Sequence, residues 1–204
     1  WTTDLYWDQS SLTANYLVAA KVKARNDNDE ETSYASISRY TSQNTPSGIT
    51  EGANTTSSIT VTATGTFPNL TDGSSGLYFE NTTSSADSTW IQTNSWTNSS
   101  LSANTAYAYR VKARNGDDDA TAYSGSTTIY SAQNAPTATN IDSKTATTVT
   151  MSATGTFPNL AVGNSGLYFE NTTASTDSGW LQVNTYTESS LTPNTQYTYT
   201  VKAR

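Results

Sequence analysis

The chain contains no cysteine and no histidine among its 204 residues. Without cysteine there are no disulfides, thiolate nucleophiles, zinc–thiolate sites or iron–sulfur centres. Without histidine there is no Ser–His or Cys–His nucleophile, and the commonest ligand of transition metals is missing. The sequence therefore predicts no resident cofactor, with calcium, considered below, as the one alternative.

Basic residues and long apolar runs are also scarce. Ten Lys and Arg stand against seventeen Asp and Glu, so the net charge is −7 and no positive footprint for nucleic acid exists. No apolar run approaches the ~18 residues of a membrane span, and residues 1–8 carry no signal-peptide pattern. Since the first residue is not Met, we expect a processed or truncated product that binds no nucleic acid and has no membrane span in this segment.

Threonine, serine and asparagine make up about two fifths of the chain, and thirteen Tyr and five Trp replace the scarce aliphatic residues as core material. A mucin-like stalk would be rich in proline and poor in aromatics. Here Thr and Ser instead alternate with Val, Ile, Tyr and Leu, and a branched β-carbon suits a pleated surface. The composition favours β-strands.

An internal repeat organises the sequence. Residues 62–70 return nearly unchanged as 152–160, and residues 76–83 return as 166–173. A third, partial copy opens the chain, where residues 1–26 align with the stretch that begins at Trp90. The period of about 90 residues is that of a domain rather than of a solenoid repeat. Each copy is therefore predicted to fold as its own unit.

Proline and polar residues at Pro46 and Pro136 mark the linkers. We expect residues 1–44 to be the C-terminal strands of a partial domain, 45–134 a complete domain, and 135–204 a domain that lacks its last strand. On this interpretation the chain is a window on a longer array, or a subunit whose open edge a neighbour fills. Its expected partners are other copies of itself or neighbouring domains of a longer chain.

Alternation with a period of two is clearest before the second acidic loop. Tyr107, Tyr109 and Val111 share one face, while Arg110 and Lys112 share the other. No segment shows a sustained period of 3.6 residues. Several short strands within about 90 residues predict an all-β fold of tandem antiparallel β-sandwiches.

Residues 191–204 and 101–116 resemble the fibronectin type III signature, Leu-x-Pro-x-Thr-x-Tyr-x-x-x-Val-x-Ala. The resemblance covers essentially the whole chain, as about two and a quarter copies, and is to tandem bacterial domains of this type in extracellular surface proteins. It implies that Tyr107 and Tyr197 form the tyrosine corner of the family. The first copy has Val18 at this position, so we expect no corner hydrogen bond there.

Two acidic loops follow equivalent strands. Their oxygen-bearing side chains are spaced as at the start of a calcium loop, since a hard cation needs several converging oxygen ligands. The alternative is a solvated hairpin whose Asn and Asp tolerate left-handed turns, and no distal bidentate Glu is evident. The candidate calcium ligands are Asp27, Asp29, Glu31, Asn115, Asp117 and Asp119.

Glu80 and Glu170 are expected to point outward beside basic residues of the neighbouring strand, namely Arg110, Lys112, Lys202 and Arg204. Cross-strand ion pairs of this kind set the register of a sheet. A catalytic carboxylate pair would need a cleft that raises one pKa, and flat sandwich faces rarely supply one. The sequence therefore predicts that the protein is not an enzyme.

Five aromatic residues are the best candidates for a contact surface, because three of them align with one another and the other two, Tyr78 and Tyr168, align with outward parity on their strand. Exposed aromatics stack on sugar rings or dock a neighbouring subunit, and the alternative is that they cover the edge of the sandwich. The candidates are Trp7, Tyr78, Trp96, Tyr168 and Tyr186.

These features predict a non-enzymatic, extracellular structural repeat protein: a segment of a microbial surface filament, sheath, surface layer or adhesin stalk. A chain free of Cys and poor in Lys and Arg resists oxidation and offers few protease sites. Because the last copy is expected to lack a strand after Arg204, assembly by strand addition is a further hypothesis. The alternative is a spacer or carbohydrate-binding module of a secreted polysaccharide-degrading enzyme, with glycans as partners.

Overall fold

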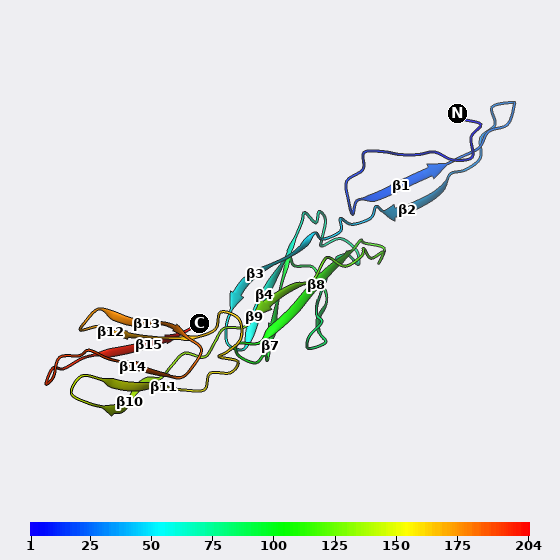
Figure 1. The fold of residues 1–204 in the computed structure, drawn as a ribbon. Helices are drawn as coiled ribbons and strands as arrows, with labels where there is room; N and C mark the ends of the chain where they lie inside the picture. The colour runs from blue at the N-terminus through cyan, green and yellow to red at the C-terminus, as the bar shows by residue number, and fades with distance from the viewer. The chain divides into compact units, whose positions relative to one another are not determined.

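The computed structural model describes residues 1–204, and every regular element in it is a β-strand (Figure 1). The predicted all-β class is confirmed. The structure contains no helix long and apolar enough to cross a membrane.

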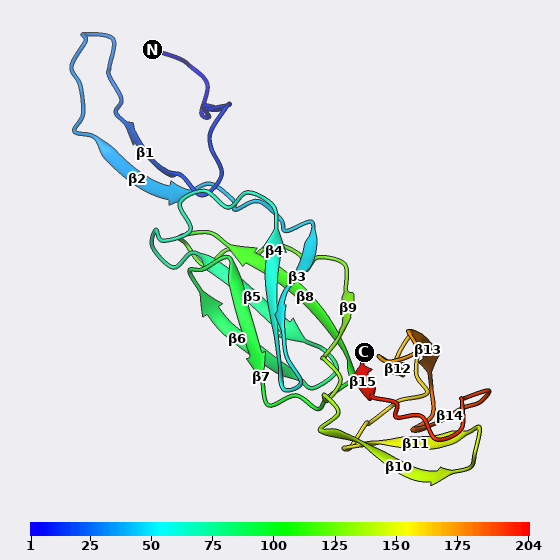
Figure 2. The ribbon, with the colours of Figure 1, turned by 90° about the vertical axis from the view of Figure 1, so that its left-hand side faces the viewer.

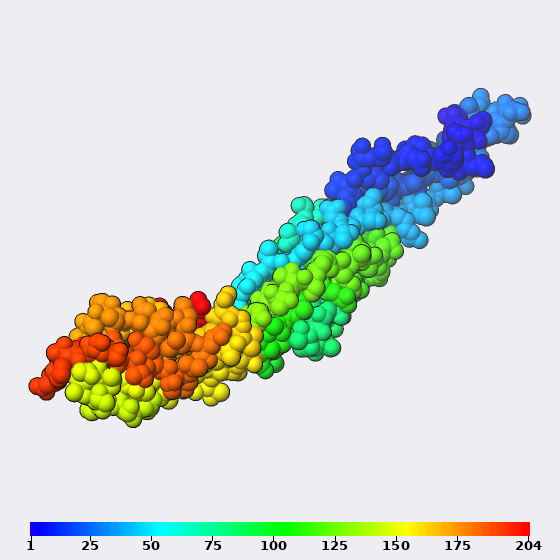
Figure 3. All heavy atoms as spheres, in the orientation of Figure 1, coloured from blue at the N-terminus to red at the C-terminus, as the bar shows by residue number.

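The first 44 residues contribute one hairpin. Strands β1 (Leu17–Val22) and β2 (Ala35–Tyr40) pair antiparallel, with Leu17 opposite Tyr40. Residues before β1 have no regular structure, and Figure 3 shows them in dark blue alongside the lighter blue hairpin. Val22 is 68% exposed, because no second sheet covers this hairpin.

Residues 45–134 form two antiparallel sheets, which Figure 2 shows with their strands side by side. One sheet has the order β3-β4-β7 and the other the order β6-β5-β8-β9. Three strands facing four in this order form a fibronectin type III-like sandwich. The strands are β3 (Gly48–Asn54), β4 (Ser58–Thr64), β5 (Gly76–Asn81), β6 (Ala86–Ile91), β7 (Ser95–Ser99), β8 (Ala106–Arg114) and β9 (Thr127–Tyr130).

The predicted alternation holds in β8, whose residues switch regularly between buried and half-buried. Tyr109 and Val111 have no exposed surface, and neither has Phe79 of β5. The tyrosine corner is present, because the backbone N–H of Ser102 donates to the Tyr107 hydroxyl at 2.9 Å. Apolar burial on one face of each strand is therefore what holds the two sheets together.

Residues 135–204 repeat this design with one strand fewer. The sheets have the orders β10-β11-β14 and β13-β12-β15. The Thr192 N–H donates to the Tyr197 hydroxyl at 2.9 Å, which is the second tyrosine corner. The strands are β10 (Ala138–Lys144), β11 (Val149–Thr154), β12 (Leu167–Asn171), β13 (Thr176–Leu181), β14 (Thr185–Glu188) and β15 (Tyr199–Ala203).

The core of the last copy is centred on Met151, Leu167 and Phe169. Strand β15 lies at the edge of its sheet, whereas its counterpart β8 pairs with β9 on that side. Tyr199 of β15 is therefore only half-buried.

The chain divides into two compact units whose limits differ from those of the repeat. Unit 1 contains residues 1–52, 60–98 and 108–128, and unit 2 contains residues 53–59, 99–107 and 129–204. The repeat period and the compact units are therefore different divisions of the same chain.

Candidate functional site: the asparagine junctions

In each unit an asparagine with a positive φ stands at the corner where the chain turns into a strand. Asn15 lies just before β1 with φ 47°, and Asn104 lies just before β8 with φ 46°. Asparagine adopts this left-handed conformation more readily than most residues. Both side chains are buried, with exposures of 0% and 5%. A buried amide needs hydrogen-bond partners, and both residues find them far away in the sequence.

In unit 1, Asn15 binds the loop that contains Pro68 and Asn69. Its Nδ2 donates to the Asn69 carbonyl at 2.6 Å and to the Pro68 carbonyl at 3.4 Å. Asn69 Nδ2 donates back to the Asn15 carbonyl at 3.0 Å. Gln43, from the linker, donates to the same Pro68 carbonyl at 3.0 Å. Four hydrogen bonds thus join the corner and the linker to one loop.

Unit 2 contains the same arrangement. Asn104 Nδ2 donates to the Pro158 carbonyl at 2.9 Å and to the Asn159 carbonyl at 3.1 Å. Asn159 Nδ2 returns a bond to the Asn104 carbonyl at 2.9 Å, and Gln133 donates to Pro158 at 2.8 Å. We call these two sets of contacts the asparagine junctions.

Hydrogen bonds also fix the conformation of the loop that contains Pro68 and Asn69. The Ser75 hydroxyl lies within hydrogen-bond distance of the Asn69 and Asp72 carbonyls, at 3.2 and 2.6 Å. Asn69 itself has φ 51°, a left-handed conformation that asparagine tolerates. Asn44 of the linker donates to the Thr66 carbonyl at 2.8 Å and so ties the other end of the loop.

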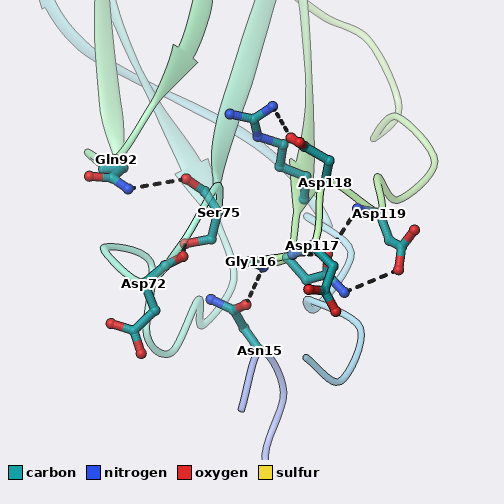
Figure 4. A network of polar contacts seen from close by, with 10 residues as sticks. Asn15, Asp72, Ser75, Gln92, Gly116, Asp117, Asp118 and Asp119 are labelled. Carbon is teal, nitrogen blue, oxygen red and sulfur yellow. Dashed lines mark hydrogen bonds and ion pairs between the residues drawn. The ribbon is translucent and has the colours of Figure 1, made fainter. Parts of the chain in front are cut away.

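The second acidic loop completes the junction of unit 1 (Figure 4). The Gly116 N–H donates to Asn15 Oδ1 at 2.8 Å, and the Tyr40 N–H donates to Asp117 Oδ2 at 2.7 Å. A Cβ at Gly116 would overlap the Tyr40 ring, and one at Gly73 would lie 2.8 Å from the Gly116 carbonyl oxygen. Only glycine fits this close approach of backbone to backbone.

The calcium candidates are engaged in other ways. Asn115 Oδ1 accepts the N–H groups of Asp117 and Asp119 at 3.1 and 2.8 Å, which closes a tight turn. In the first acidic loop Asp29 pairs with Arg25 at 2.7 Å, and Glu31 pairs with Lys23; Asp27 is exposed. No group of three or more acidic side chains comes together to hold a metal ion. Calcium binding stays a prediction from the sequence alone.

Two of the five aromatic candidates lie on the inner side of their sheet. Trp96 stacks on Phe79 with ring centroids 6.4 Å apart, and Tyr186 stacks on Phe169 at 6.0 Å. Both are half-buried, because the alternation in β7 and β14 turns them toward the core. Trp7 is 72% exposed. Of the predicted contact surface, Trp96 and Tyr186 therefore pack against the core with part of each ring still exposed.

Tyr78 and Tyr168 point outward, as predicted, but cations lie over their rings. Lys112 Nζ lies 5.1 Å from the Tyr78 centroid, and Lys202 Nζ lies 4.5 Å from that of Tyr168. Burial and a hydrogen bond to Asp87 raise the pKa of Tyr78 to about 12. Cation–π contacts of this kind contribute roughly 0.5–1 kcal/mol at exposed sites. They also leave less ring surface for a sugar.

The expected pairing of the outward glutamates is found in only one copy. Arg110 Nε donates to Glu80 Oε2 at 2.6 Å. The prediction for Glu170 is wrong, because the residue opposite it in the register is Thr200, which carries no charge.

The junctions were not found from the sequence, although a signal was present. Pro68-Asn69 and Pro158-Asn159 stand in loops whose surroundings are repeated almost letter for letter. Burial in the core does not require such near-identity in a loop. Two identical loops therefore pointed to a shared contact.

No protein-family model matches the chain, and no curated protein does. Among solved structures, the FN1–FN3 domains of chicken CNTN1 are similar at 17% identity and a TM-score of 0.38, covering 91% of this chain and 71% of that one. A two-domain fibronectin type III segment of chicken tenascin is similar at 16% identity and a TM-score of 0.42, covering 78% and 90%.

Proposed function

We propose that this chain is a non-enzymatic structural spacer in which successive repeats are joined by the asparagine junctions. The single observation that carries the proposal is the recurrence of the junction: Asn15 and Asn104 make equivalent contacts with equivalent loops. Because the same residue types form the contact in both places, we infer that successive repeats are joined in the same way. A fibronectin type III-like fold supports a structural or spacer role.

The energetics of the junction suit a durable connection. Each junction asparagine donates from its side chain and accepts at its backbone carbonyl. Truncating the side chain would remove these donors, although the loop carbonyls keep other hydrogen bonds, such as that from Gln43 or Gln133. A net hydrogen bond contributes about 1 kcal/mol. Each junction therefore stabilises the contact between neighbouring repeats by a few kcal/mol.

We place this spacer outside a microbial cell, as a segment of a filament, sheath, surface layer or adhesin stalk. The support is compositional: the chain has no cysteine to oxidise and only ten Lys and Arg where trypsin-like proteases cut. Immunogold electron microscopy of intact cells tests this location. Labelling confined to the cell interior would contradict it.

A carbohydrate-binding module is less well supported by the exposed rings. The outward ring of Tyr78 contacts Lys112, and its centroid lies 5.4 Å from the ring centroid of Trp90. A glycan array probed with the full chain separates the two functions. Binding that is lost in Tyr78→Ala and Tyr168→Ala would favour the module over the spacer.

Substitution of the junction asparagine tests the spacer mechanism directly. Asn104→Gly keeps the positive φ accessible but removes the side chain. We expect the backbone amides of the linker at residues 131–135 to exchange hydrogen about tenfold faster or more, since a loss of 1.4 kcal/mol is a factor of ten. Asn194→Gly is the matched control, because Asn194 is exposed. Equal exchange in both variants would refute the junction.

A further inference from the structure

The last repeat carries a third asparagine corner. Asn194 has φ 55°, close to the values of Asn15 and Asn104. It lies in the same tyrosine corner, since the Thr192-to-Tyr197 hydrogen bond has the same length, 2.9 Å, as its counterpart before β8. The backbone around Asn194 is therefore already in the conformation that binds a loop in the other two corners.

The surroundings of this corner differ in one respect. Asn15 and Asn104 are buried beneath the loops that they bind, whereas Asn194 is exposed. Its amide makes no hydrogen bond within the chain. The corner thus offers two Nδ2 protons, a side-chain oxygen and a backbone carbonyl in a conformation that has been set in advance.

We propose that Asn194 binds the Thr-Phe-Pro-Asn-Leu loop of a further copy of this repeat, joined in tandem. Both loops of this sequence within the chain are already bound, Pro68-Asn69 by Asn15 and Pro158-Asn159 by Asn104. The partner is therefore an additional repeat whose loop is free. This inference rests on the proposed function of the junctions.

The two junctions described above explain why we expect the partner repeat to belong to the same chain rather than to a separate molecule. In each of them the linker also binds the loop, through Gln43 or Gln133, 25 residues before the proline that accepts the bond. A covalent linker thus delivers part of the contact together with the loop. It also raises the effective concentration of the loop to the millimolar range.

The contact is head to tail, since a corner of one repeat binds a loop of the next. An interface of this type does not close on itself unless the rotation between copies forms a ring. One corner and one loop per repeat therefore allow the same contact to recur between every pair of successive repeats in a chain.

An extended chain tests the proposal. Appending a second copy of residues 115–204 after Arg204 continues the period, because Arg114 and Arg204 are equivalent positions of the repeat. Asn194→Gly is then made in both the original and the extended chain, with Asn104→Gly as the benchmark in each. Hydrogen exchange of residues 191–197 reports the opening of the corner.

In the extended chain we expect Asn194→Gly to raise the opening constant of residues 191–197 about tenfold or more, as the loss of the junction bonds implies. In the original chain the same change should have less than a ~2-fold effect, as for an exposed residue. Replacing the appended copy's equivalent of Asn159 by Gly should reproduce the tenfold loss from the loop side.

Two outcomes would overturn the inference in different ways. If Asn104→Gly accelerates exchange but Asn194→Gly has no larger effect in the extended chain than in the original, the third corner is not a docking site. If Asn104→Gly also has no effect, the proposed function itself fails. Protection of the appended strands, measured in the same experiment, shows that the added repeat is folded.

Discussion

The middle and last repeats place different groups at one buried polar position of the same design. In residues 45–134 this position is Asn98, whose Oδ1 accepts hydrogen bonds from Asn81 at 2.7 Å and from the Tyr109 hydroxyl at 3.1 Å. In residues 135–204 it is Glu188, which accepts from Asn171 at 2.9 Å and from Thr176.

The comparison shows that the fold demands an acceptor here and tolerates a charge. Burial acts to raise the pKa of Glu188, but hydrogen bonds from Thr176, Tyr199 and Asn171 outweigh it and hold that pKa below its usual value. A carboxylate can be buried only when several donors converge on it. The last repeat therefore depends on pH at a place where the middle repeat does not.

The two repeats also differ in how completely the strand after the tyrosine corner is covered. Strand β9 flanks β8, and Tyr109 is fully buried, whereas the equivalent Tyr199 in the edge strand β15 is half-buried. Burial of this ring should therefore contribute more to the stability of the middle repeat.

Among the predicted changes in stability, truncation of this tyrosine ring should have the largest effect. Tyr109→Ala should cost about 4 kcal/mol, as for other large aromatic truncations, and Tyr199→Ala only about 2 kcal/mol, because less buried area is lost. Hydrogen exchange of β8 and β15 in the full chain measures each repeat separately. Equal losses would show that the flanking strand does not matter.

A shorter extension of the chain should make the structure of the last repeat more similar to that of the middle one. A cavity of about 510 Å³ is lined by Asn104, Tyr130, Gln133 and Arg204. In unit 1 the acidic loop binds the equivalent residues Asn15 and Tyr40. Appending residues 115–134 after Arg204 should fill the cavity and pair with β15.

The expected gain from this extension is roughly 2–3 kcal/mol, from apolar burial and new strand bonds. Denaturant titration of the extended chain measures it. An extension of the same length made of Gly and Ser is the control. A gain no greater than that of the control would contradict the predicted pairing.

Acid should weaken the last repeat more than the middle one. The folded pKa of Glu188 is lowered, so its contribution is complete above the unfolded pKa and is lost as the pH falls through the folded value. Glu188→Gln should cost about 1–2 kcal/mol near pH 7, as hydrogen bonds to a charged group are lost, and should flatten this acid dependence. Hydrogen exchange of β12, compared with β5, at several pH values checks both statements.

The smallest expected effect concerns the outward ion pair. Arg110→Thr makes β8 resemble β15, where Thr200 faces Glu170. Because the pair is partly exposed, the change should cost less than ~1 kcal/mol, and less still at high salt. Thermal unfolding at two salt concentrations measures it. A large loss that is insensitive to salt would mean that the Arg110 stem packs rather than pairs.

The strands and their buried faces could be predicted from the sequence because alternation in β8 is a local property. The tyrosine corner was implied by the resemblance to the fibronectin type III signature. The structure confirms it, and Tyr107 receives its hydrogen bond from a residue five positions away.

The junctions could not be derived in the same way, since Asn104 and Pro158 are 54 residues apart. No local pattern states which loop an asparagine will meet. The inward orientation of Trp96 did not follow from its alignment with Trp7, but it does follow from the register of β7, in which Trp96 shares a face with the buried Asn98. Within a copy, the register of the strand was the better guide.

The side-chain contacts of Asn15, Gln43, Pro68 and Asn69 contain no ionisable group. Dissolved ions therefore have little to screen, and a change of acidity has no proton to add or remove. The four hydrogen bonds of this corner should therefore keep their strength from fresh water to brine, whereas the neighbouring bond from the Tyr40 N–H to Asp117 involves a carboxylate.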